Sequence, residues 1–188
     1  MFSVSSCFIA DFKIGDNINY NLKTLRVLYE IGGENAERRK HLPKPITITL
    51  VSIVEAMLYD FIRRVQSRES VPTLPKATLQ ALKAKVYSKL TNLVAGAKTH
   101  DLFQADAEFY DQIEELRQLR NRVHIQNERN HFERDESRAF SAARQYRAEE
   151  VLEYIAKFLA ANHPRKASLH GYVRDLQFPW EERWDFGP

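Results

Sequence analysis

A short segment in the second half of the chain gathers side chains that could bind and cleave a phosphodiester. The stretch ELRQLRNRVHIQN contains Arg117, Arg120, Asn121 and His124. An imidazole has a pKa near neutrality, so it can take a proton from a ribose 2′-hydroxyl or give one to the leaving 5′-oxygen. Guanidinium groups can hold the scissile phosphate and stabilise the charge that develops on its oxygens. The four residues therefore suggest a metal-independent site in which the 2′-oxygen of RNA attacks its own backbone.

A helix over about residues 107–126 would bring these side chains together. With ~3.6 residues per turn, Arg117, Arg120, Asn121 and His124 fall within an arc of ~100° beside the apolar face, and Arg122 points well away from them. Side chains at the border of a core can line a groove or a subunit contact, where partial burial strengthens their electrostatic interactions. The predicted core-facing stripe consists of Phe109, Ile113, Leu116, Leu119 and Val123.

A solvated basic face is the competing interpretation of the same stretch. Between Ile113 and Arg147 the sequence has eight arginines and no lysine, against six acidic residues. Arginine suits bidentate contact with phosphate or carboxylate, so RNA and an acidic protein surface both fit as partners. An arginine-rich helix with interspersed glutamates is also a common solvated face, and the helix dipole favours a histidine near a C-terminus. Glu114 and Glu115 would then be the local ion-pair partners.

Composition indicates one domain without a metal or cofactor. The chain of 188 residues is 44% hydrophobic and 28% charged, which is enough for a single core, and its net charge of +3 identifies no partner. The one cysteine, Cys7, excludes an internal disulfide, and no Cys/His or carboxylate cluster suggests a metal site. The sequence also shows no signal-like or long uninterrupted apolar segment, so we expect a cytoplasmic protein that does not span a membrane.

Periodicity of apolar residues predicts an all-α, up-and-down bundle of four main helices plus a shorter N-terminal one. The first predicted helix follows an Asp16 cap, and the third should end at Gly96 as a C-cap. Its apolar stripe would consist of Leu79, Leu82, Val86, Leu90 and Leu93. No strand pair with a hairpin signature is found. The predicted helices cover residues 16–31, 46–65, 76–96, about 107–126 and a last stretch ending near Asn162.

The tail of the chain differs from this pattern. We expect a single domain over residues 1–188, with a helical core at about 16–162 and a C-terminal extension at 163–188. The stretch HGYVRDLQFPWEERWDFGP is rich in aromatic residues and holds both tryptophans. Large aromatic side chains are costly to leave in water, so we expect a strap that docks on the bundle or on a partner subunit. A peptide-like docking element for another protein is the alternative.

Arginine, an adjacent polar residue and histidine on a late helix of a small bundle resemble the HEPN superfamily, whose signature is Arg, four to six residues, then His. Arg117 and His124 fit that spacing. Arg120-Asn121 resembles the frequent Arg-Asn pair of the family, at a shorter distance from the histidine. The stretch SIVEAMLYDFI is similar to an earlier HEPN helix in which acidic residues, here Glu55 and Asp60, lie among leucine-like positions.

The resemblance implies a metal-independent endoribonuclease that acts as a homodimer, with the motifs of two subunits in a shared cleft. His124 would be the general acid or base, Arg117 and Arg120 would bind the phosphate, and Asn121 and Glu55 would support substrate binding. HEPN proteins often serve in toxin–antitoxin, phage-defence or RNA-processing systems, which implies an antitoxin or nucleotidyltransferase-type partner. Some members do not cleave RNA, so a silent module that binds a partner protein or RNA is the alternative.

Overall fold

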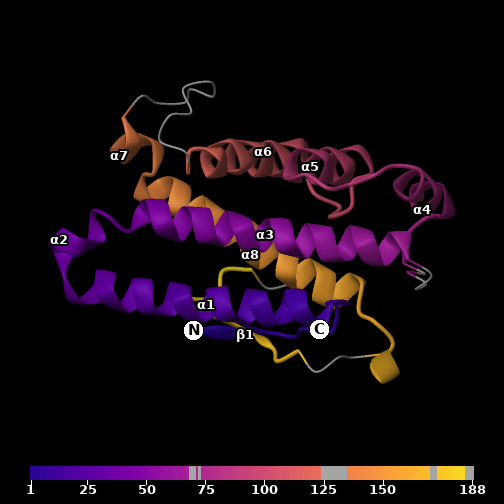
Figure 1. The fold of residues 1–188 in the computed structure, drawn as a ribbon, viewed down its shortest axis with the longest axis horizontal. Coiled ribbons are helices and arrows are strands. Elements are labelled where there is room, and N and C mark those ends of the chain that lie inside the picture. Colours follow the sequence, from indigo (N-terminus) through magenta and orange to yellow (C-terminus); the bar gives the residue numbers. More distant parts are fainter. Residues whose placement is uncertain (68–70, 72, 124–134, 170–172, 185–188) are drawn as a thin grey trace.

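The computed structural model describes the whole chain except residues 68–70, 72, 124–134, 170–172 and 185–188. Over the described residues the protein is mostly helical, which confirms the predicted all-α class. The long helices α1, α3, α6 and α8 run in alternating directions, as expected for an up-and-down bundle (Figure 1). The elements are β1 (Phe2–Val4), α1 (Phe12–Glu34), α2 (Ala36–Arg39), α3 (Pro43–Gln66), α4 (Lys76–Lys83), α5 (Leu90–Thr99), α6 (Ala107–Asn121), α7 (Glu136–Ala139), α8 (Ala142–Asn162), the 3-10 turn Ala167–Leu169 and β2 (Leu176–Phe178).

Helix α3 is the centre of the bundle. It contacts α1, α4, α5, α6 and α8, and its side chains are buried on more than one face. Pro43 at its first turn has no intrahelical N–H to lose, and Arg63 and Arg64 lie in the last turn, where cations favour the helix dipole. By length and composition alone α3 could cross a membrane, but 61% of its most apolar window is buried inside this fold. Its apolar character is therefore accounted for by its central position.

Helix α1 is longer than the sequence suggested. It begins at Phe12 because the side chain of Asp11 accepts the N–H groups of Lys13 and Ile14, at 2.8 and 3.2 Å. The predicted cap at Asp16 is therefore wrong. With 23 residues, α1 is comparable to α3 and α8 rather than a short N-terminal addition.

The predicted helix over residues 76–96 is two helices, α4 and α5, joined by an extended link. Val86 of this link is exposed, not part of the core, whereas Tyr87 turns inward against α5. Gly96 lies inside α5 rather than at a C-cap, and a Cβ there would be 2.5 Å from Cε1 of Tyr87. Gly96 thus allows the Tyr87 ring to lie directly on the helix backbone.

The two ends of the chain meet in a small sheet that the sequence did not predict. Strand β1 pairs antiparallel with β2, with Phe2 opposite Phe178. Val4, Phe8 and Ile9 belong to the same hydrophobic cluster as the helices and the tail, so the core extends beyond the predicted 16–162. The aromatic tail docks on the bundle of its own chain, as the strap interpretation predicted.

Two buried glutamates of α8 hold the strap. The side chain of Glu153 accepts from the indole Nε1 of Trp180 at 3.0 Å and from the backbone N–H groups of Arg183 and Trp184, both at 2.8 Å. Glu149, one turn earlier, accepts from the guanidinium of Arg183. Burying a carboxylate costs free energy unless its oxygens are satisfied, and here the strap supplies the donors.

Candidate functional site at the end of α6

Helix α6 ends earlier than the sequence suggested. Ile113, Leu116 and Leu119 face the core as predicted, but the helix stops at Asn121 rather than near Gln126. The last turn tightens, since the N–H of Arg122 reaches the carbonyl of Leu119 at 3.0 Å. Arg122 is buried and pairs with Glu136 of α7 at 3.8 Å.

Val123 is exposed and does not continue the predicted stripe. The helical geometry that was expected to align His124 with Arg117 and Arg120 therefore does not extend beyond Asn121. His124 itself lies outside the described residues, and so does its predicted pairing with either arginine.

Arg117 is bound within its own helix. Its Nε and Nη2 donate to the two carboxylate oxygens of Glu114, at 2.8 and 2.6 Å, and Gln118 adds a third hydrogen bond to the same carboxylate at 3.2 Å. Glu114 raises the pKa of the Arg117 guanidinium, and Arg117 in turn lowers the pKa of Glu114. An anion that approached Arg117 would compete with a bidentate partner already in place.

Arg120 is joined to the central helix. Its Nη2 lies 3.0 Å from Oε2 of Glu55, so the ion pair links the end of α6 to the middle of α3. The side chain of Arg120 is 38% exposed and that of Glu55 is 25% exposed, so solvent reaches both groups. The structure thus brings together Arg120, which the chemistry of its stretch suggested for the site, and Glu55, which the family resemblance suggested.

Glu55 also lines a cavity of about 290 Å³ between α1, α3 and the start of α5. Ser52 and Tyr59 lie one turn on either side of Glu55 along α3 and present hydroxyl groups there, although the Ser52 hydroxyl donates to the carbonyl of Ile48 at 2.8 Å. The ion pair with Arg120 therefore begins at the wall of an open cavity.

Asp60, the second acidic residue of the predicted HEPN-like helix, has a structural role. It is buried and accepts the backbone N–H groups of Ala10 and Asp11, at 2.8 and 2.9 Å. Burial raises the pKa of its carboxyl group. Asp60 fixes the start of α1 on α3 and takes no part in the candidate site.

Asn121 is the last residue of α6 and is half-buried. It makes a polar contact of its own and is not a free group. Of the five residues predicted for the site, the structure joins Glu55 with Arg120, pairs Arg117 with Glu114 and places Asn121 at the end of α6, while His124 lies outside the described residues.

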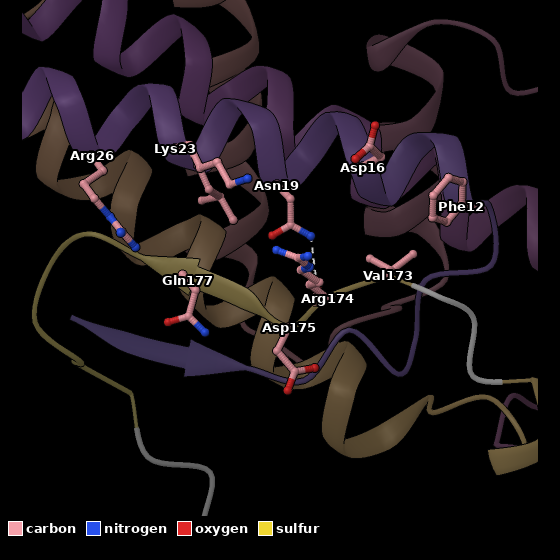
Figure 2. A pocket seen from close by; sticks show the side chains of 10 residues that line it. Phe12, Asp16, Asn19, Lys23, Arg26, Val173, Arg174, Asp175 and Gln177 are labelled. Atoms are coloured by element: carbon pink, nitrogen blue, oxygen red, sulfur yellow. Dashed lines mark hydrogen bonds between the residues drawn. The ribbon is translucent and has the colours of Figure 1, made fainter.

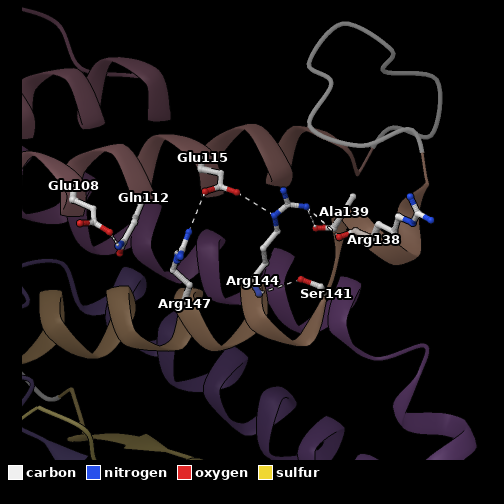
Figure 3. Close-up of polar contacts among 8 residues, drawn as sticks. All are labelled: Glu108, Gln112, Glu115, Arg138, Ala139, Ser141, Arg144 and Arg147. Carbon is white, nitrogen blue, oxygen red and sulfur yellow. Dashed lines mark hydrogen bonds and ion pairs between the residues drawn. The ribbon is translucent and has the colours of Figure 1, made fainter.

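The sequence did not predict the arginine network that joins α6 to α8. Glu115 accepts from Nε of Arg144 at 3.0 Å and from Nη1 of Arg147 at 3.4 Å (Figure 3). Arg144 also donates to the carbonyls of Arg138 and Ala139, both at 3.1 Å, and so ties α7 to α8. The spacing of Arg144 and Arg147, three residues apart on one helix face, is the signal that could have indicated a shared partner.

Carboxylates thus partner Arg117, Arg120, Arg122, Arg144 and Arg147 in this region. No group of three or more His, Cys, Asp or Glu side chains that could hold a metal ion occurs among the residues that the structure describes. The described residues of the site offer guanidinium groups and the Asn121 amide.

Comparison with protein-family models, with curated proteins and with solved structures finds no match to this chain. The resemblance to HEPN proteins rests on the residue pattern of two stretches, 52–62 and 117–124.

Proposed function

We propose that the chain is a metal-independent endoribonuclease of HEPN type that acts in the cytoplasm as a homodimer. The observation that supports this most is the Arg120–Glu55 pair. It holds a solvent-reachable guanidinium at the end of α6, four residues before His124. A single cysteine and no internal disulfide fit a reducing compartment.

In this proposal Arg120 is the main phosphate-binding residue. Among the described residues, Glu55 is its one charged partner and engages a single nitrogen, whereas Glu114 occupies two nitrogens of Arg117. No other described carboxylate engages the rest of the Arg120 fork, and there the scissile phosphate would bind. Glu55 positions Arg120, whereas Arg117 would have to exchange its partner Glu114 before it could bind the phosphate.

His124 would move the protons. As a base it takes the proton from the 2′-hydroxyl, whose oxygen attacks the adjacent phosphorus. The 5′-oxygen of the next nucleotide leaves and receives a proton, which gives a 2′,3′-cyclic phosphate and a 5′-hydroxyl. Asn121 would orient the ribose. A second copy of the chain would supply the other half of the cleft, and an antitoxin or nucleotidyltransferase-type partner would control access.

RNA digestion in EDTA tests this proposal. We expect the wild-type protein to cut RNA. The variants His124→Ala and Arg120→Ala should each reduce the cleavage rate by at least ~100-fold, because the loss of a general acid–base group or of a transition-state cation has effects of that size. His41→Ala and Arg38→Ala are matched controls, because both residues are exposed and remote in sequence. Equal rates for wild type and His124→Ala would overturn the proposal.

A catalytically silent interaction module is the second candidate. It is favoured by the way in which Glu114 and Glu115 already engage Arg117, Arg144 and Arg147, since such pairs stabilise a surface without an external anion. Stoichiometric binding of RNA or a partner protein, without cleavage of any RNA offered and without change in His124→Ala, would favour the module over the nuclease.

A further inference from the structure

A second cavity lies between α1 and the segment that leads into β2 (Figure 2). Helices α1 and α6 lie at opposite edges of the fold (Figure 1). The volume of the cavity is about 640 Å³. This is within the range of pockets that hold small molecules. None of its lining residues belongs to the candidate site at the end of α6, so an inference from this cavity is independent of the proposed nuclease.

Three cations line the cavity. Lys23 and Arg26 lie one turn apart on α1, and Arg174 faces them from the strand side (Figure 2). Within the described ranges, none of the three side chains has an ion-pair or hydrogen-bond partner, and Nε of Arg26 is buried without one. Lys23 and Arg174 are exposed and Arg26 is half-buried, so water screens part of the repulsion among the three cations, and an anion that binds between them removes the rest.

The acidic residues of the cavity do not neutralise these cations. The carboxylate of Asp175 accepts the backbone N–H of Ser6 at 3.0 Å and points away from α1 in Figure 2. Asp16 pairs with Lys13 at 3.7 Å. With two carboxylates engaged elsewhere and three cations without partners, the pocket presents donors to an anionic ligand.

Packing of α1 against the segment that leads into β2 fixes the walls of the cavity. Asn19 donates its side-chain N–H to the carbonyl of Arg174 at 2.9 Å. Gly15 lets the chain approach closely, since a Cβ at this position would lie 2.6 Å from either γ-carbon of Val173. The cavity is therefore formed before any ligand binds, which lowers the entropic cost of binding.

An aromatic ring lies at the other end of the cavity from the cations. Phe12, the first residue of α1, is 56% exposed, and Figure 2 shows it beside Val173 and away from Lys23 and Arg26. A flat base can stack on such a ring, while phosphate oxygens suit the planar donors of arginine.

We propose that this cavity binds a nucleotide, with its base against Phe12 and its phosphates between Lys23 and Arg174, and with Arg26 one turn beyond as a further positive charge. The anion explains the unpartnered cations, and the exposed ring at the far end selects a ligand with a planar apolar part. The bound nucleotide lies against both α1 and the strap, so binding stabilises the docked strap.

Calorimetric titration of the full chain with ADP, pyrophosphate, adenosine and a short single-stranded RNA tests the proposal. We expect saturable binding of ADP, with weaker binding of pyrophosphate and of adenosine. Lys23→Gln and Arg174→Gln should each weaken ADP binding about tenfold or more, as expected for a lost charge-assisted hydrogen bond. Lys83→Gln and Arg38→Gln, at exposed positions outside the cavity, should bind like wild type.

Phe12→Ala separates the two halves of the site. It should weaken ADP binding about fivefold or more and leave pyrophosphate binding unchanged, because only the base stacks on the ring. Two results would overturn the proposal: ADP binding that is the same in wild type and in the triple variant of Lys23, Arg26 and Arg174, or no binding of ADP at millimolar concentration. Binding of the RNA alone would also overturn it and would assign the basic groove to a nucleic-acid backbone.

Discussion

The guanidinium of Arg120 and the carboxylate of Glu55 form an ion pair of 3.0 Å that joins the end of α6 to the middle of α3. Both groups are reachable from solvent, so the pair contributes little to stability, about 0.5 kcal/mol for exposed pairs of this kind. In the proposed nuclease the ion pair matters for position, because Glu55 determines where the guanidinium of Arg120 can bind a phosphate.

A charge swap at this pair separates position from stability. In Glu55→Arg/Arg120→Glu the ion pair can re-form, so the free energy of unfolding should stay within about 0.5 kcal/mol of wild type. RNA cleavage should nevertheless be lost, since the cation has moved to α3. Urea denaturation and a cleavage assay on the same samples measure both effects. Full activity in the swapped variant would mean that Arg120 has only a structural role.

Stability should fall in mildly acidic solution because of His163. Burial and the neighbouring Arg64 lower the pKa of this imidazole from 6.5 to about 4. The unfolded chain therefore takes up a proton below pH 6.5, whereas the folded chain does so only near pH 4. The folded state is favoured fully above pH 6.5 and loses this contribution, on the order of 2 kcal/mol, as the pH falls toward 4.

The variant His163→Gln has no group to titrate and retains a side chain that can bond to Thr73, the partner of Nδ1 at 2.6 Å. Chemical denaturation between pH 7 and 4.5 should show a smaller loss of stability in the variant than in wild type. Parallel pH profiles for the two proteins would contradict the assignment.

Removal of Glu153 should release the strap. Glu153→Ala leaves the indole of Trp180 and the backbone N–H groups of Arg183 and Trp184 without their acceptor, which should cost about 3 kcal/mol of unfolding free energy. Both tryptophans of the protein lie in the strap, so their emission should shift to longer wavelength. Glu150→Ala, on the same helix but without a strap contact in the described structure, is the control. An unchanged emission spectrum in Glu153→Ala would show that other contacts suffice.

Two glycine substitutions should have opposite signs. Gly96→Ala places a Cβ 2.5 Å from the Tyr87 ring and should destabilise the protein by about 1–3 kcal/mol through overpacking. Gly33→Ala, within α1 and with nothing in contact, should stabilise it by about 0.5–1 kcal/mol through helix propensity. Thermal unfolding of both variants checks the prediction, and a stabilised Gly96→Ala would contradict the packing of Tyr87 on α5.

Apolar periodicity was sufficient where a helix packs on a continuous core. It predicted α3 and the C-terminal end of α8 at Asn162 within a few residues, because their buried faces persist to the ends. It failed at Val86 and Val123, two apolar residues that continue a stripe in the sequence but lie in solvent. The periodicity of apolar residues does not reveal where a neighbouring helix ends or where the chain turns.

Contacts between distant parts of the chain account for the other differences. Phe2 pairs with Phe178, and neither strand has a local partner or turn that would indicate pairing. The sequence also placed Glu55 and Arg120 in one site only through a family resemblance, and their ion pair depends on how α3 and α6 pack. Asp60 came from the same resemblance, yet it accepts the backbone N–H groups of Ala10 and Asp11 and so has a structural role.

The ends of the cleaved RNA test the nuclease proposal most directly. We predict that the purified protein in EDTA converts RNA to fragments with 2′,3′-cyclic phosphate and 5′-hydroxyl ends, and leaves the same sequence with 2′-O-methyl groups intact. Equal cleavage of the methylated RNA, or no cleavage of any RNA offered, would contradict an attack by the 2′-oxygen at the end of α6.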